Sequence, residues 1–225
     1  PDDVLHLADH LRLERFAVLG VSGGGPYALA CAWRIPAVDP GRMAGCAMVC
    51  PLGPLYIPEL LRAMNWAVRA NLAIGKRPAW LADLLFGRYT TAVVHRWPAL
   101  VEKVRHIAAP PADHKVLGEG DNAAVLNATI ADAMRDRARG ARRDLVLYTH
   151  DWKLPFAEVT DPVTIWHGQA DGTVPIEHAR WYAEHLPQAR LNELPDEGHY
   201  SVPLLYSRRI LDELLVGFAD QSATH

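Results

Sequence analysis

Hydrophobic and polar positions alternate with different periods along the chain, and the periods change twice. Apolar residues recur at helical spacing over residues 3–11, while short apolar runs at 16–19 and 42–50 are typical of buried strands. Between those runs, the alanine-rich segment 26–33 is typical of a packed helix. This alternation of helices and strands predicts a parallel sheet.

The middle of the chain, residues 54–143, has a different pattern. Its apolar residues follow helical periods, alanine is frequent, and no segment is typical of a strand. We predict a long helix at 57–75 and shorter helices after it. Because this region is too long for a loop, we predict an inserted helical cap, with a core formed by residues 1–53 and 144–225.

The alternation of strands and helices resumes after Pro162. We predict two strands and two helices, in the order strand 163–168, helix 175–186, strand 189–195 and helix 202–218. The predicted class is therefore α/β, with a mostly parallel sheet flanked by helices and interrupted by the helical insertion.

Composition narrows the class of protein and its partners. The 225 residues are 50% hydrophobic and 22% charged, with a formal net charge of −3, which is typical of an ordinary globular protein. Without a basic cluster, we expect no nucleic-acid partner and no membrane partner. No apolar run reaches the roughly 18 residues that span a bilayer, and no signal-peptide pattern opens the chain, so we expect a cytoplasmic protein.

Three cysteines, Cys31, Cys46 and Cys50, form an odd set without metal-ligand spacing. Cys46 and Cys50 are four residues apart on a predicted strand, which separates them by about 13 Å, too far for a disulfide. We therefore predict three reduced core cysteines, and we expect neither a metal nor a cofactor.

The stretch "AVLGVSGGGPYALACAWR" places Ser22 among glycines between a predicted strand and a predicted helix. A sharp turn there strains the turn residue and requires neighbours without Cβ atoms, which Gly20 and Gly24 provide. The GxSxG pattern is typical of a nucleophile elbow, which holds the serine Oγ at the carboxyl end of a sheet. A flexible Gly-Ser turn is the alternative interpretation.

A serine nucleophile needs a base, and histidine is the natural one because its unperturbed pKa is near 6.5. His199 follows the last predicted strand directly, so we expect it at the same sheet edge as Ser22. His178 and His185 lie in a predicted helix and are expected to be exposed. His167 ends a strand and is expected to be structural.

The base in turn needs a carboxylate that fixes its tautomer. Asp171 lies just past the carboxyl end of strand 163–168, whereas Asp161 flanks the same strand at its amino end. Asp171 has a structural alternative as a turn or helix-capping residue, because Asp-Gly favours turns and Pro175 follows.

The order serine, acid, histidine and the motifs GVSGG, WHGQADGTVP and EGHYS resemble the α/β-hydrolase superfamily. The resemblance covers residues 1–51 and 162–225, and the middle corresponds to the variable cap of that family. It implies Ser22 as nucleophile, His199 as general base, Asp171 as its carboxylate partner and the Gly23 N–H as one oxyanion donor. Members with a serine nucleophile are typically esterases, lipases, peptidases, C–C hydrolases or acyltransferases.

We therefore expect a serine hydrolase that acts on a small-molecule acyl substrate. The alternative is a binding or receptor protein built on the same fold, since fold does not determine function. Aromatic residues of the insertion, namely Trp66, Trp80, Phe86 and Trp97, could line a pocket, but at helical spacing they are more often core residues.

The chain departs from the family pattern before the elbow. In the family, several strands and a loop with a second oxyanion donor precede the nucleophile, whereas here one helix and one strand precede Ser22. An apolar strand edge with unpaired backbone groups promotes association. We expect the edge at Phe16 to Leu19 either to be completed by a preceding segment or to pair with a second copy in a homodimer.

Overall fold

The structure is a computed structural model that describes residues 1–75, 77, 79–82, 84–85, 88, 91–97 and 109–220. It divides into two compact units, a core unit of Pro1–Gly53 with Lys153–His225 and a helical unit of Pro54–Trp152. The core was predicted to resume at residue 144, but that position falls inside a helix, α10 (Arg135–Tyr148), of the helical unit.

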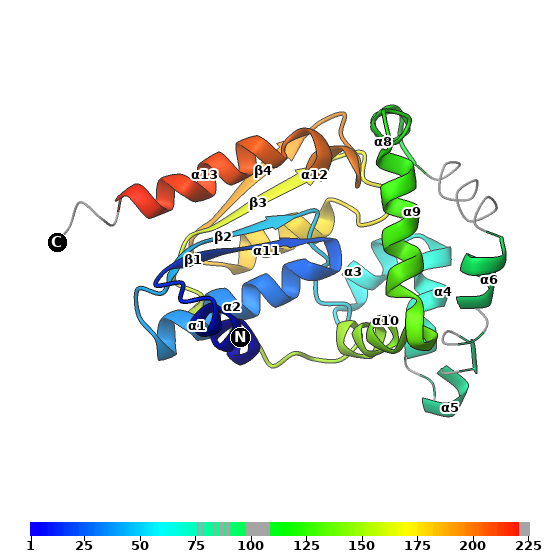
Figure 1. Cartoon of the computed structure of the whole chain (residues 1–225), viewed down its shortest axis with the longest axis horizontal. Coiled ribbons are helices and arrows are strands. Elements are labelled where there is room, and N and C mark those ends of the chain that lie inside the picture. The colour runs from blue at the N-terminus through cyan, green and yellow to red at the C-terminus, as the bar shows by residue number, and fades with distance from the viewer. Residues whose placement is uncertain are drawn as a thin grey trace. The chain divides into compact units, whose positions relative to one another are not determined.

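The described residues of the core unit form a four-stranded sheet in which every neighbouring pair is parallel. In the order β1-β2-β3-β4 the strands are Phe16–Val21, Met43–Val49, Val163–Gly168 and Ala189–Leu194 (Figure 1). Sequence order and spatial order coincide, and all four carboxyl ends meet at one edge of the sheet. The predicted α/β class with a parallel sheet is confirmed.

Helices cover both faces of this sheet (Figure 1). One face carries α1, α2 and α11, which span Asp2–His10, Gly25–Val38 and Glu177–His185. The opposite face carries α12 (Ser201–Leu205) and α13 (Ser207–Asp220). The single closing helix predicted at 202–218 is therefore two helices, which meet at Tyr206.

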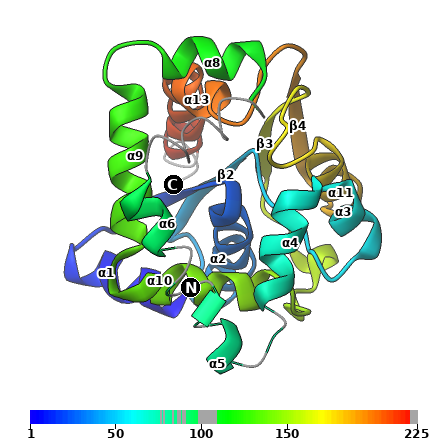
Figure 2. The ribbon, with the colours of Figure 1, turned by 90° about the vertical axis from the view of Figure 1, so that its right-hand side faces the viewer.

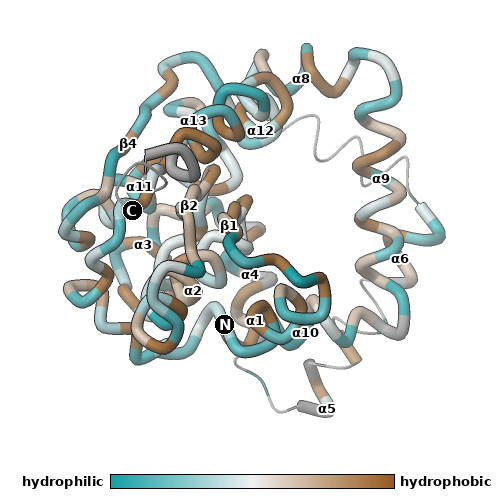
Figure 3. The backbone as a smooth tube through the Cα atoms, turned by 60° about the vertical axis from the view of Figure 1, so that its left-hand side comes forward, coloured by the Kyte–Doolittle hydropathy of each residue, from teal (hydrophilic) through white to brown (hydrophobic). Residues whose placement is uncertain are grey.

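Hydrophobic residues, whose stretches of the backbone tube are brown in Figure 3, form two buried clusters between the sheet and its helices. On the α2 side, fully buried Leu29, Met48 and Ile165 join helix and strands in one cluster. On the α13 side, Trp166 and Ile210 belong to a second cluster. Burying large apolar side chains contributes about 1.5–3 kcal/mol for each, so these two clusters hold the three layers together.

All three cysteines are buried in this core, and none of them forms a disulfide. Burial in apolar surroundings raises the pKa of the Cys46 thiol to about 12. The prediction of reduced core cysteines is confirmed.

Strand β1 stands at the edge of the described sheet, with β2 as its neighbour. Phe16 and Val18 pack into the cluster on the α2 side, so Leu19 and Val21 point to the other face. Their exposed fractions are 41% and 38%. Pairing with a second copy through this edge stays a prediction.

The helical unit contains described helices that the sequence pattern placed only coarsely. They are α3 Pro58–Ala63, α4 Trp66–Gly75, α5 Ala79–Ala82, α6 Thr91–Arg96, α8 Pro111–Leu117, α9 Asn122–Ala133 and α10 (Figure 2). The predicted long helix at 57–75 is broken because Met64 is extended, with ψ 144°, and the Asn65 side chain accepts the Val68 N–H at 2.9 Å. Asn65 thus starts a new helix, as asparagine at an N-terminus often does.

The tryptophans of the insertion are not core residues. Trp66, Trp80 and Trp97 have exposed fractions of 81%, 70% and 53%, so that interpretation is wrong for them. Trp66 and Arg69 border a cavity of about 410 Å³ within the helical unit. Phe86 lies outside the described residues.

The close approach of β1 and α2 depends on Gly20. A Cβ atom there would lie 2.4 Å from the Gly24 carbonyl oxygen and 2.8 Å from Ala28 Cβ. Gly24, which was expected to serve the same purpose, has no atom within 4 Å of its hypothetical Cβ, and Gly25 packs on Pro51 instead. The steric requirement therefore falls on Gly20 and Gly25.

We predict that Gly20→Ala lowers the free energy of unfolding by about 1–3 kcal/mol, because the added methyl group overpacks the β1–α2 contact. The matched variant Gly24→Ala has open space and a φ of −75°, and it should change stability by less than about 0.5 kcal/mol. Urea unfolding followed by circular dichroism measures both values. Equal destabilisation by the two substitutions would contradict this account of the turn.

Candidate active site

Ser22 follows β1 directly and opens the 3₁₀ turn Ser22–Gly24, after which α2 begins. Its φ of 55° lies in the left-handed region, which a residue with a Cβ atom rarely adopts. Such a conformation costs about 1–3 kcal/mol and persists where surrounding structure enforces it. The elbow predicted from the glycine pattern is thus a strained strand-to-helix turn.

A second strained residue follows the neighbouring strand. Cys50, which comes directly after β2, has a φ of 46°. Its N–H still donates to the Trp166 carbonyl at 2.8 Å, as in the β2–β3 ladder. The chain then turns, and the Leu52 N–H donates to the Ser22 carbonyl at 3.0 Å. The segment Pro51–Gly53 is called the strap below.

Asp171 lies in the loop after β3 with a residue exposure of 6%. Its Oδ1 accepts the backbone N–H groups of Thr173 and Val174, both at 2.8 Å. Its Oδ2 lies 2.7 Å from His199 Nδ1 and 3.4 Å from His167 Nε2. Asp171 therefore acts as a turn residue through one oxygen and as a histidine partner through the other.

His199 lies in the loop after β4 and is 7% exposed. This loop is fixed locally, because the Gly198 N–H donates to Ser201 Oγ at 2.8 Å. It is also joined to the Asp171 loop, since the Ala170 N–H donates to the Glu197 carbonyl at 3.0 Å. The 2.7 Å contact between His199 and Asp171 thus rests on two loops that hold each other.

The environment of Asp171 favours the charged carboxylate. Burial alone would raise its pKa, but the charge of His199 and hydrogen bonds from His167 and His199 outweigh burial and hold the pKa well below its usual range. Because the carboxylate accepts from His199 Nδ1, the ring carries its hydrogen there. Nε2 is then the nitrogen that can act as a base.

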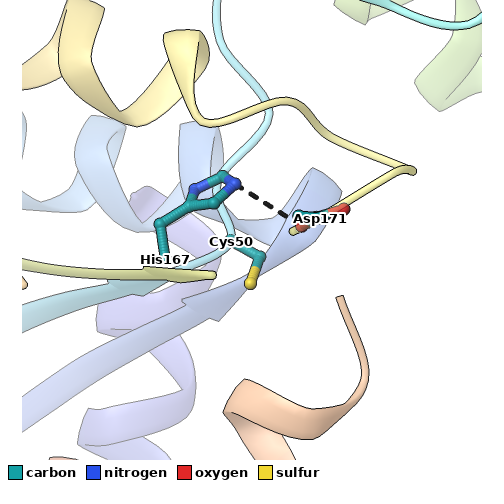
Figure 4. Close-up of side chains that lie close together, drawn as sticks. All are labelled: Cys50, His167 and Asp171. Atoms are coloured by element: carbon teal, nitrogen blue, oxygen red, sulfur yellow. Dashed lines mark ion pairs between the residues drawn. The ribbon is translucent and has the colours of Figure 1, made fainter. Parts of the chain in front are cut away.

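Cys50, His167 and Asp171 lie close together around this loop (Figure 4). Their possible metal-ligating atoms are within 4.8 Å of one another. Each atom already has a protein partner, since Cys50 Sγ contacts the Gly198 carbonyl at 3.9 Å and His167 Nε2 donates to the Val174 carbonyl at 2.8 Å. Hydrogen bonding accounts for the cluster, and we assign no metal to it.

Some of the candidate residues are in direct contact, and others share only the same edge of the sheet. Asp171 and His199 are in direct contact. Ser22 and Gly23 lie at the same edge of the sheet, after β1. Asp161 precedes β3 and lies at the opposite edge, as expected.

The three histidines that were weighed against His199 differ in their exposure. His185 is exposed and His167 is a buried, hydrogen-bonded structural residue, both as predicted. The prediction for His178 is wrong, because its exposed fraction is 0% and its Nδ1 accepts the Gly53 N–H at 2.9 Å.

Sequence reasoning also missed Tyr182, whose hydroxyl donates to the Leu52 carbonyl at 2.8 Å. His178 and Tyr182 are four residues apart on α11, and that spacing on one helix face was the available signal.

Comparison with known proteins establishes the family. A family model described as alpha/beta hydrolase fold matches residues 1–203, and the chain belongs to this family. A pimeloyl-[acyl-carrier protein] methyl ester esterase of Aromatoleum aromaticum is 40% identical over 76 residues, which are 33% of this chain and 30% of the relative. The corresponding esterase of Nitrosomonas europaea is 39% identical over 54 residues, 24% of this chain and 21% of the relative. The matches thus span less than a third of either relative.

Solved structures show the same fold at low sequence identity. An alpha/beta hydrolase from a Medee basin deep-sea metagenome library, MGS-M2, has a TM-score of 0.60 at 17% identity and covers 97% of this chain and 70% of its own. A thermophilic esterase from Thermogutta terrifontis has a TM-score of 0.59 at 18% identity, with the same coverage of 97% and 70%. Among the described residues, no helix has the length and apolar character needed to cross a membrane. The cytoplasmic location stays a prediction.

The lowered pKa of Asp171 predicts acid sensitivity. A carboxyl whose pKa is lower in the folded state stabilises the fold above its unfolded value, near 3.9, and that stability is lost as pH falls through the folded pKa. We expect the wild type to lose on the order of 1–3 kcal/mol between pH 5 and strongly acidic pH through this group.

Asp171→Asn should therefore show a shallower decline of unfolding free energy over the same pH range, measured by urea unfolding at a series of pH values. Asp196→Asn, at an exposed position between β4 and His199, is the matched control and should keep the wild-type slope. Parallel curves for the wild type and Asp171→Asn would overturn the assignment of a charged, buried Asp171.

Proposed function

We propose that the protein is a serine hydrolase that cleaves an ester or related acyl bond of a small molecule through an acyl-enzyme. The observation that carries the proposal is the buried Asp171–His199 pair, with its 2.7 Å contact, at the sheet edge where the Ser22 elbow also lies. Membership of the α/β-hydrolase fold family supports it.

In the proposed reaction, His199 Nε2 takes the proton of the Ser22 hydroxyl as Oγ attacks the acyl carbon. Asp171 stabilises the imidazolium that forms, which is the role its charged state suits. The proton then passes to the leaving alcohol, and a bond between acyl carbon and Ser22 Oγ replaces the ester bond. Water, activated by the same histidine, releases the acid and restores the hydroxyl.

Negative charge develops on the acyl oxygen in both steps. The Gly23 N–H follows the nucleophile in the turn that opens α2, and we propose it as one donor to this oxygen. A helix N-terminus favours negative charge nearby, which supports this position.

The alternative, a binding or receptor protein on the same fold, shares the sheet and the loops. A reactive serine distinguishes the two, because a fluorophosphonate probe labels an activated hydroxyl and leaves an ordinary serine unmodified. Labelling at Ser22 supports the hydrolase; a stable protein that is never labelled supports the binding protein.

The relatives guide the choice of substrates. Two of them carry the name of a methyl ester esterase, so methyl esters belong in a screen beside p-nitrophenyl esters of increasing chain length. We propose that the helical unit Pro54–Trp152 acts as the cap of this enzyme and contributes to the choice of acyl group.

We predict that Ser22→Ala and His199→Ala each lower kcat for the best p-nitrophenyl ester by roughly 10³- to 10⁶-fold, and that the double variant is hardly worse, because such residues act as a unit. Steady-state kinetics and probe labelling of the same preparations measure this. Ser207→Ala, at an exposed serine that begins α13, is the control and should keep wild-type kcat. Turnover that survives Ser22→Ala would place the reaction elsewhere.

A further inference from the structure

We infer that His178 and Tyr182 of α11 are positioning residues that orient the oxyanion donor through the strap Pro51–Gly53. This inference rests on the proposed function, since it assigns a task to the elbow of that reaction. Both side chains are fully buried, with exposed fractions of 0%, and neither belongs to the pair that handles the proton.

The Ser22–Gly23 peptide group carries the proposed oxyanion donor. The carbonyl of Ser22 and the N–H of Gly23 belong to the same planar unit, so fixing one fixes the direction of the other. The Leu52 N–H donates to that carbonyl at 3.0 Å. A carbonyl that accepts a hydrogen bond also makes the N–H of its own peptide a stronger donor, by about 10–30%. The Gly25 N–H donates to the same carbonyl within the turn, so the strap supplies a second hydrogen bond that helps to set the direction and strength of the Gly23 donor.

Two side chains of α11 hold the strap in place. Helix α11 contacts both polar atoms of the Leu52–Gly53 peptide: the Tyr182 hydroxyl donates to the Leu52 carbonyl at 2.8 Å, and His178 Nδ1 accepts the Gly53 N–H at 2.9 Å. Both side chains lie on one face of the helix, because they are four residues apart. A peptide held at both atoms cannot rotate, so Leu52 keeps its place beside Ser22.

Helix α11 is itself anchored to the sheet, which allows it to support the strap. Arg180 of α11 forms two hydrogen bonds with Glu193 of β4, at 2.9 and 2.7 Å. The hydrogen bonds from Arg180 lower the pKa of Glu193 to about 2, so the pair stays charged at neutral pH. Gln169 donates to the same carboxylate at 2.6 Å. Helix α11 is thus joined to the strand that leads to His199.

The steric contacts agree with this assignment. A Cβ atom on Gly25 would lie 2.6 Å from Pro51 Cβ, so the strap packs directly on the start of α2. The strap is therefore confined between the elbow and α11, and a loosened strap would remove one of the two hydrogen bonds that fix the Ser22 carbonyl, which would leave the Ser22–Gly23 peptide less firmly oriented.

The test uses Tyr182→Phe, which removes one hydroxyl group, and the pair His178→Leu and His178→Asn. Asparagine can place its side-chain oxygen near the position of Nδ1 and accept the Gly53 N–H, whereas leucine cannot. With a p-nitrophenyl ester, we expect Tyr182→Phe and His178→Leu to lower kcat by about 10-fold and to change KM by less than about 2-fold. His178→Asn should recover most of the kcat.

Two further readouts separate positioning from general damage to the fold. An alkyl boronic acid forms a tetrahedral adduct with the serine and places an oxygen at the oxyanion position, so its inhibition constant should rise about as much as kcat/KM falls. The pH midpoints of kcat/KM should stay at wild-type values, because the Asp171–His199 pair is untouched. His185→Leu, on the same helix with its Nδ1 at 2.7 Å from the Trp181 carbonyl, is the matched control and should behave as the wild type.

The outcomes also separate this inference from the proposed function. A wild-type protein with no turnover and no probe labelling at Ser22 refutes the proposed function itself. An active wild type that is abolished by Ser22→Ala, with Tyr182→Phe and His178→Leu within 2-fold of its kcat, overturns the positioning role and leaves the hydrolase standing. Loss of kcat together with shifted pH midpoints would likewise overturn it, since the damage would then have reached His199.

Discussion

The buried carboxylate of Asp171 sets the conditions that the rest of the site must meet. A charged group removed from water costs several kcal/mol unless hydrogen-bond donors replace the lost solvent. Here the donors come from the turn of its own loop, from the end of β3 and from the loop after β4. Because all of these donors must converge on two oxygens, the loops after β3 and β4 have little conformational freedom. The position of His199 is therefore fixed as well.

The elbow is held by a different kind of constraint. Ser22 and Cys50 follow neighbouring strands, and both adopt a left-handed φ. Two such residues together cost about 2–6 kcal/mol, which the β1–β2–β3 ladder and the buried contacts of the strap offset. The turn at Cys50 directs Leu52 toward the Ser22 carbonyl. The strained turn at Cys50 therefore helps to hold the strained turn at Ser22.

Much of this arrangement could be predicted from the sequence, and the reason is topological. In a parallel sheet, residues that follow strands share an edge, so Ser22, Asp171 and His199 could be identified by their positions after apolar runs. The spacing of His178 and Tyr182 places them on one helix face, but it does not show that their partners are backbone atoms of Leu52 and Gly53, because backbone groups carry no sequence signal. The break in the long predicted helix depended likewise on a local side-chain bond of Asn65.

The strap and the α11 residues that hold it lie far apart along the chain, and this distance affects the order of folding. His178 and Tyr182 contact residues that lie 125 and 130 positions earlier. Contacts of such high sequence separation form late, because a long loop must close before they can be made. The elbow can form as soon as β1 and α2 pack. The Leu52–Gly53 peptide is hydrogen-bonded to α11 only when the unit β3–α11–β4 has docked. Maturation of the site is thereby coupled to completion of the core, so a partly folded chain exposes a serine whose surroundings are still unassembled.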